Sequence, residues 1–206
     1  MGFFTILSLT AALSQADYEP LALHELFLGS DIIVLGAIEE VRDDTFLLED
    51  YEVLSGPDPD RALEVKRFVD WSGNSRWNEY RAGQKVLLFL TRPGDELKDG
   101  PRPWKIRGYG GEGEMPVEDG FIYCHGLFLE GFSKQRFRVQ QGTLDGYRFH
   151  LDDFLSALKG YNSCFQFDEG PNKRHPKSIV QQCDDETLAN YRKQSPLHHY
   201  LLEQTL

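Results

Sequence analysis

The sequence predicts a mainly β fold: a small closed antiparallel barrel with a short helix before it and a helical extension after it. Residues 32–35 are consecutive apolar residues, Ile-Ile-Val-Leu, so a strand there is apolar on both faces. Residues 85–91 have the same character. The other apolar segments are short, half polar and separated by turns rich in Gly and Pro. Many short strands with such turns are typical of a closed or nearly closed barrel.

The elements follow from local patterns in chain order. Residues 20–28 predict a helix with its apolar side chains on one face, and Gly29 can end it. Residues 45–54 predict one strand whose alternation changes phase at Glu49 and Asp50, as a β-bulge would produce. Asp119-Gly120 predicts the turn of a hairpin. Helices are predicted from Asp152, after Asp184 and after Ser195. The expected barrel therefore spans residues 17–151 and the extension residues 152–206.

Composition limits the class of protein. The 206 residues carry a formal net charge of −11, which repels phosphate backbones and anionic lipid unless basic side chains gather on one face. No apolar run approaches the roughly 20 residues that a membrane-spanning helix needs. We expect a soluble globular protein without a transmembrane segment, and no nucleic-acid partner.

Residues 1–16 predict a secretory signal peptide. Residues 3–13 form an apolar core of suitable length, and Ser14 and Ala16 are small residues suited to cleavage before Asp17. The alternative is a buried N-terminal strand or helix. With the signal, the protein is exported to the periplasm or the exterior.

The three cysteines fit the same expectation. In an exported protein, Cys164 and Cys183 are the natural disulfide pair, because they flank one polar loop, and closing it would stabilise by roughly 3 kcal/mol. Cys124 would remain unpaired in an apolar strand. The alternative is a cytosolic protein with three reduced cysteines.

The order of these features resembles the netrin-like fold, the OB-type barrel of tissue inhibitors of metalloproteinases. The matching segments read SDIIVLGAIEEV, DYEVLSGP, LEVKRF and AGQKVLLFL, within residues 21–123. Exported bacterial proteins without an assigned role look similar. The family inhibits proteases through an N-terminal cysteine that chelates zinc, but no cysteine precedes Cys124 here. The resemblance therefore implies the fold and not metalloproteinase inhibition.

Candidate catalytic and metal-binding residues are sparse. His198-His199 and Cys124-His125 are adjacent pairs whose side chains diverge, and no spacing typical of a metal site occurs. Cys124 beside His125 lacks a third, orienting group. We expect no cofactor and no metal, and we expect these residues to be structural.

Two further segments have a functional and a structural interpretation. Residues 109–114 have the glycine density of a phosphate loop, but their two glutamates favour a flexible barrel loop. Arg136 and Arg138 share a strand face near Phe132 and Phe137, as in OB barrels that bind single strands. The net charge favours a solvated face instead.

The most informative polar stretch is residues 71–80, where aromatic residues lie among hydrogen-bonding side chains. Such a mixture suits a protein or ligand contact. The alternative is a loop folded back so that its tryptophans cap the barrel. The expected contact residues, including a second loop, are Trp71, Arg76, Trp77, Tyr80, Trp104, Arg107 and Tyr109.

These patterns favour an exported, non-enzymatic binding or regulatory module. Its partner would be a protein or a small ligand outside the cytoplasm. The first alternative is a small extracytoplasmic hydrolase whose site the sequence does not display. Nucleic-acid binding through Arg136 and Arg138 is the weaker alternative. The sequence leaves the ligand and the oligomeric state open.

Overall fold

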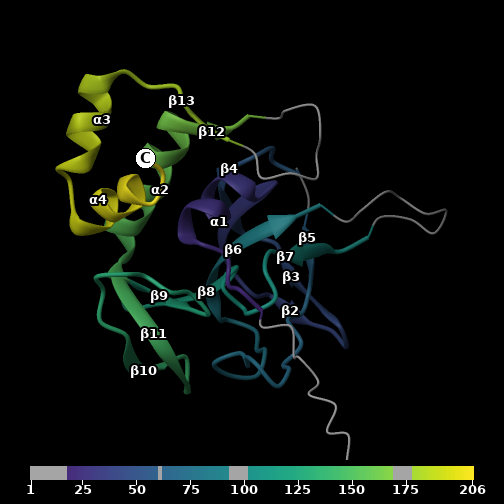
Figure 1. Ribbon diagram of the computed structural model, residues 1–206. Helices are drawn as coiled ribbons and strands as arrows, with labels where there is room; N and C mark the ends of the chain where they lie inside the picture. Colours follow the sequence, from purple (N-terminus) through teal and green to yellow (C-terminus); the bar gives the residue numbers. More distant parts are fainter. Residues whose placement is uncertain (1–17, 60–61, 93–101, 169–177) are drawn as a thin grey trace, which may run out of the picture.

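The computed structural model describes residues 18–59, 62–92, 102–168 and 178–206 (Figure 1). The predicted signal peptide, residues 1–16, lies outside this part of the chain. The helices are α1 (Leu23–Gly29), α2 (Leu151–Cys164), α3 (Asp185–Arg192) and α4 (Pro196–Glu203). The strands are β1 (Ile32–Ala37), β2 (Glu40–Val41), β3 (Thr45–Leu48), β4 (Tyr51–Ser55), β5 (Leu63–Lys66), β6 (Lys85–Thr91), β7 (Trp104–Ile106), β8 (Glu114–Glu118), β9 (Phe121–His125), β10 (Gln135–Val139), β11 (Gly142–His150), β12 (Phe165–Phe167) and β13 (Ile179–Gln181).

The prediction of a small closed antiparallel barrel is wrong. Within the described residues, eleven strands form one large sheet in the order β10-β11-β9-β8-β6-β7-β5-β3-β2, and β1 pairs with both β4 and β6. The pair β5–β7 is parallel, so the sheet is mixed. The sheet forks at β6, which pairs with β8 near its start and with β7 near its end. Local alternation predicts where strands lie, but it does not say which strands pair, and pairing decides closure.

The segment predicted as one bulged strand is two strands. β3 pairs with β2 and β5, whereas β4 pairs with β1. The phase change at Glu49 and Asp50 is therefore a turn that moves the chain to a different neighbour. The hairpin prediction is confirmed: β8 and β9 pair across Asp119 and Gly120, whose φ angles are 52° and 78°. Both values are positive, as the tight hairpin turn requires.

β1 divides the interior into two apolar cores. Its residues Ile33 and Leu35 face a core shared with the helices, and Ile32 and Val34 face a second core on the other side of the sheet. All five residues from Ile32 to Gly36 are buried, and Ile32, Ile33 and Val34 are fully inaccessible, as expected from the unbroken apolar run. Burying each such side chain stabilises the fold by roughly 1.5–3 kcal/mol. This rigid strand and its neighbour β6 hold the loops described below.

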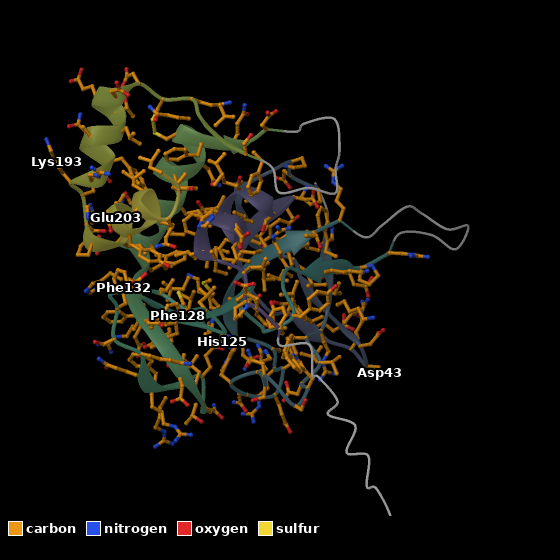
Figure 2. The ribbon with its side chains drawn as sticks, in the orientation of Figure 1. Asp43, His125, Phe128, Phe132, Lys193 and Glu203 are labelled. Carbon is orange, nitrogen blue, oxygen red and sulfur yellow. A yellow bond between two sulfur atoms is a disulfide. The ribbon has the colours of Figure 1, made fainter. Side chains whose placement is uncertain are left out.

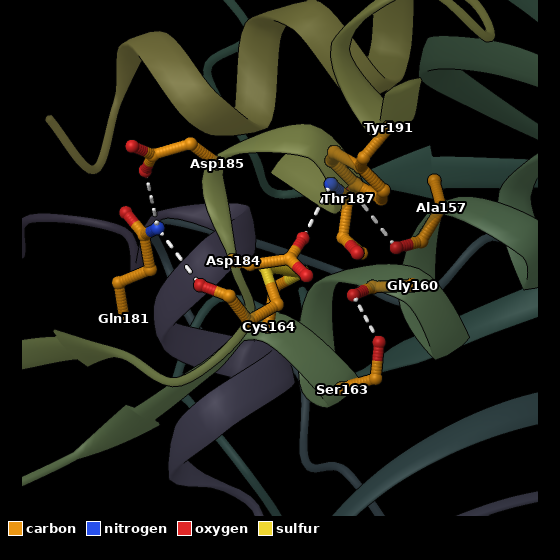
Figure 3. The surroundings of a disulfide bond; sticks show 10 residues. Ala157, Gly160, Ser163, Cys164, Gln181, Asp184, Asp185, Thr187 and Tyr191 are labelled. Carbon is orange, nitrogen blue, oxygen red and sulfur yellow. Dashed lines mark hydrogen bonds between the residues drawn. A yellow bond between two sulfur atoms is a disulfide. The ribbon is translucent and has the colours of Figure 1, made fainter. Parts of the chain in front are cut away.

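Helices α2, α3 and α4 gather at one end of the molecule, and α1 lies between α2 and the sheet (Figure 1). Phe27 of α1 stacks on Phe89 of β6 and meets Phe154 of α2 edge-on. A disulfide joins Cys164, at the end of α2, to Cys183, just before α3 (Figure 3). It is the pair that the sequence predicts. No helix in the described part of the chain is long and apolar enough to cross a membrane.

Candidate functional site

Two parallel strands separate at one place on the sheet. β5 and β7 pair only through Val65 with Trp104 and Lys66 with Lys105. Beyond this pair, the Arg67 N–H donates to the carbonyl of Asp44, next to β3, at 2.9 Å. The Arg107 N–H instead donates to Phe89 of β6, at 2.8 Å. Because the segments after β5 and β7 bind different neighbouring strands, a gap opens between the ends of these two strands.

A groove of about 570 Å³ lies at this gap. We call it the Trp71 groove, and its lining includes Tyr18, Lys66, Val69, Trp71, Lys105 and Tyr109. Three of these apolar side chains are exposed: 72% for Val69, 43% for Trp71 and 78% for Tyr109. Large apolar side chains that face water together mark a surface able to bind a partner.

The walls of the groove are tied together by hydrogen bonds. The indole Nε1 of Trp71 donates to the carbonyl oxygen of Tyr109 at 2.7 Å. Trp71 also exchanges two backbone hydrogen bonds with Asn74, and the Asn74 amide donates to the carbonyl of Gly110. Two loops that lie far apart in the sequence are therefore held as one wall.

Tyr18 completes this wall from the N-terminal side. Its ring meets the rings of Trp71 and Tyr109 edge-on, at centroid distances of 6.0 and 6.1 Å. Its hydroxyl donates to Glu112 and accepts from the Tyr109 N–H. Burial, together with the hydrogen bond to Glu112, raises the pKa of Tyr18 to about 12. Tyr18 is therefore a neutral wall residue at physiological pH and not a base.

Glu112 anchors the N-terminal segment from inside the protein. It is fully buried and accepts from the Tyr18 hydroxyl, from the Leu21 N–H at 3.2 Å and from the Gly110 N–H at 2.7 Å. The sequence predicts a flexible loop at residues 109–114. Its two glutamates do not fit that prediction, because Glu114 is buried like Glu112. Both carboxylates bind protein groups, which makes the loop part of the scaffold.

The rim of the groove is basic, although the whole chain has a formal net charge of −11. Lys66 and Lys105 are neighbours in the register of β5 and β7. Arg67 lies beside them, with its guanidinium donating to the carbonyls of Arg42 and Asp43 at 3.2 and 2.9 Å. A local group of cations next to apolar side chains favours an anionic ligand with apolar parts.

Three of the predicted contact residues lie in the interior instead. The Arg76 guanidinium lies between the rings of Trp77 and Tyr80, 3.8 Å from each centroid. Its Nη2 donates to Glu114 Oε1 at 2.8 Å, and the Tyr80 hydroxyl donates to the other carboxylate oxygen at 2.7 Å. Trp77 is only 4% exposed. These residues fix the loop from below. Of the two tryptophans that the alternative placed as caps of a barrel, Trp77 is buried and Trp71 is not, and the sheet is not a closed barrel.

The remaining two predicted residues lie apart from the groove. Trp104 lines a separate hollow of about 310 Å³ together with Pro57, Pro59 and Arg92. Arg107 is half-buried against Gly29 of α1, and burial lowers the pKa of its guanidinium. Of the seven predicted residues, Trp71 and Tyr109 thus meet in the Trp71 groove, and Arg76 and Tyr80 line a neighbouring hollow of about 510 Å³.

The Cys124–His125 pair has no catalytic geometry. Cys124 is fully buried against Met115, and burial raises the pKa of its thiol. His125 Nε2 lies 2.9 Å from the carbonyl oxygen of Glu114, and burial lowers its pKa to about 4. Among the described residues, no three His, Cys, Asp or Glu side chains are grouped to hold a metal ion.

The other candidates are surface or structural residues. Arg136 is exposed and lies 3.9 Å from Asp145, and Arg138 is exposed on the same strand, β10. His198 is buried and its Nδ1 lies 2.8 Å from the Ser195 hydroxyl, while His199 pairs with Glu203 on the surface.

The sequence did not predict Tyr18, Lys66, Val69 or Lys105 as site residues. Lys66 and Lys105 each occupy a polar position of an alternating strand, a visible signal, but only the parallel pairing of β5 and β7 brings them together. No local sequence pattern indicates that the ring of Tyr18 contacts the ring of Trp71.

No family model, curated protein or solved structure matches the chain.

Proposed function

We propose that the protein is an exported, non-enzymatic binding module that contacts an anionic ligand through the Trp71 groove. One observation carries the proposal: Trp71, Val69 and Tyr109 are exposed together beside Lys66 and Lys105, in a chain with a net charge of −11. Aromatic side chains contribute large contact areas, and the lysines attract charge of opposite sign.

The rigidity of the groove supports binding. Ordering a flexible loop on a ligand costs roughly 0.5–1.5 kcal/mol for each immobilised side chain. Here the Trp71–Tyr109 and Asn74–Gly110 hydrogen bonds already hold the walls in place. A ligand therefore meets a surface that needs little rearrangement.

The disulfide supports the proposed export. Disulfides persist in oxidising compartments and are rare in the cytosol. Cys164 and Cys183 are joined, and residues 1–16 have the pattern of a signal peptide. The groove would then face the periplasm or the exterior.

Photo-crosslinking tests this function. A benzophenone side chain is introduced at Val69, which is 72% exposed in the groove, and as a matched control at Val180, which is 39% exposed on β13. Extracytoplasmic extract from expressing cells is added before irradiation. We expect crosslinked adducts from the probe at position 69, and we expect these adducts to disappear when the same protein also carries Trp71→Ala. The probe at position 180 should not form these adducts. Equal adducts from both positions would refute the groove as the binding surface.

A further inference from the structure

A second hollow lies on the other side of Trp71. It has a volume of about 820 Å³ and shares Tyr18 and Trp71 with the Trp71 groove. Its own lining includes Phe128 and Lys134, and we call it the Phe128 hollow. The two depressions are therefore separated by a single aromatic ridge, Tyr18 and Trp71.

The exposure of Phe128 is fixed by its neighbours. Leu127 is 5% exposed and Leu129 is 1% exposed, so both anchor the segment in the core, while Phe128 between them is 74% exposed. The Leu129 N–H also donates to the buried hydroxyl of Tyr147 at 3.1 Å. Phe128 lies between His125 and Phe132 in the view of Figure 2. The fold thus holds this aromatic ring at the surface.

The two depressions repeat the same chemistry. The Trp71 groove combines exposed Val69 with Lys66 and Lys105, and the Phe128 hollow combines exposed Phe128 with Lys134. Each depression is of the size that holds a small ligand, about 300–1,000 Å³. A compact ligand would fill only one of them. An extended chain that crosses the ridge would use both.

We propose that the occupant is an extended acidic peptide segment of a partner protein, lying across Tyr18 and Trp71. This inference rests on the proposed function of the Trp71 groove. In an extended strand, alternate side chains point to the same face, so apolar residues can meet the groove while acidic residues reach the lysines. Charge complementarity favours the acidic sequence, because Lys66, Arg67 and Lys105 line the Trp71 groove and Lys134 lines the Phe128 hollow. Exposed Val69 and Phe128 offer no hydrogen bonds, which favours apolar peptide side chains over an acidic glycan.

The test measures fluorescence anisotropy with labelled peptides. The long probe has about twelve residues and alternates Asp or Glu with Leu or Phe, and the short probe is about four residues of the same sequence. Matched probes are a long peptide with Lys in place of the acidic residues and an oligogalacturonate of equal charge. The variants are Lys66→Glu and Lys134→Glu, and the control is Lys159→Glu, an exposed lysine on α2.

We expect the long acidic peptide to bind and the basic peptide not to bind. Lys66→Glu and Lys134→Glu should each weaken the long peptide at least about tenfold, since each reverses a nearby charge. The short peptide should be sensitive to Lys66→Glu or Lys134→Glu, but not to both. Lys159→Glu should change neither affinity by more than about twofold.

Three results would overturn the inference in distinguishable ways. If Lys134→Glu behaves like Lys159→Glu, the ligand does not cross the ridge, but the Trp71 groove remains the site. Tighter binding of the oligogalacturonate than of the acidic peptide would replace the peptide with a glycan. If no probe binds, the acidic-peptide inference is wrong, whereas crosslinking at Val69 still decides the proposed function on its own.

Discussion

The indole Nε1 of Trp71 donates a 2.7 Å hydrogen bond to the carbonyl oxygen of Tyr109. This bond joins the loop after β5 to the loop after β7, and it leaves Trp71 43% exposed. The neighbouring Trp77 is only 4% exposed and packs with Arg76 and His125. The two tryptophans of one loop therefore have different roles, the first at the surface and the second in the core.

Truncating the two tryptophans should separate these roles. Trp77→Ala should lower the free energy of unfolding by roughly 3–5 kcal/mol, because it leaves a cavity in the core. Trp71→Ala loses one hydrogen bond and a ring that is only partly buried, so its loss should be smaller, about 1–2 kcal/mol. Urea unfolding monitored by circular dichroism measures both. Equal losses in the two variants would show that Trp71 is also a core residue.

The Arg76–Glu114 pair should be essential for stability. The side chains are 3% and 1% exposed, and removing one partner leaves a buried charge without compensation. Glu114→Gln should therefore destabilise by roughly 3–5 kcal/mol. The control is Asp145→Asn in the exposed pair with Arg136, which should change stability by about 0–1 kcal/mol.

A double variant makes this prediction specific to the pair. Arg76→Met combined with Glu114→Gln should destabilise by less than the sum of the two single variants, since neither charge is then buried alone. Additive losses would mean that the two side chains contribute independently.

The strands were largely predictable, because each follows from a local pattern. Residues 32–35 and 85–91 form central strands, and Asp119-Gly120 forms the expected hairpin turn. That the sheet does not close into a barrel was not predictable in this way. It depends on β6 accepting β7 and β8 along one edge, a long-range pairing that alternation does not encode.

The candidate site was predictable only in part. Aromatic residues beside polar ones pointed to residues 71–80, but the same composition describes an exposed groove wall and a buried stack. The sequence predicts Arg76 as a contact residue and a flexible loop around Glu114, whereas the two side chains form a buried ion pair. A buried ion pair between distant segments leaves no local signal in either of them.

Stability should decrease as the pH falls through the acidic range, partly through His125. Burial lowers its pKa to about 4 in the folded protein, against an ordinary value of 6.5. Between these values the unfolded chain binds the proton and the folded chain does not, so the free energy of unfolding falls by roughly 3 kcal/mol from about pH 6.5 to about pH 4 and then levels off.

Denaturation curves of His125→Gln measured over this range should show a shallower slope than the wild-type protein. The comparison is His199→Gln, which removes a histidine whose side chain is 48% exposed. An unchanged slope in His125→Gln would refute the assignment of this pH dependence to His125.

The disulfide should stabilise the helical end of the protein. Cys164 and Cys183 are 19 residues apart, and closing a loop of this length stabilises by roughly 3 kcal/mol in the chain-entropy model. The Cys164→Ala/Cys183→Ala variant should lose about this amount in urea unfolding.

In the native protein, iodoacetamide should leave Cys124 unmodified, because the thiol is buried and its pKa is raised. Rapid native alkylation of Cys124 would contradict its burial.

The most direct test of the Trp71 groove uses the three tryptophan indole N–H signals in a nitrogen-15 NMR spectrum. Each signal is assigned with a Trp→Phe variant, and the long acidic peptide is titrated in at low and at high salt. The Trp71 signal should shift on binding, with a smaller shift at high salt because screening weakens the charge attraction. The Trp77 signal, from an indole that faces Gln140 in the interior, should stay in place. A shift confined to Trp104, or binding that leaves Trp71 unchanged, would contradict the groove as the ligand site.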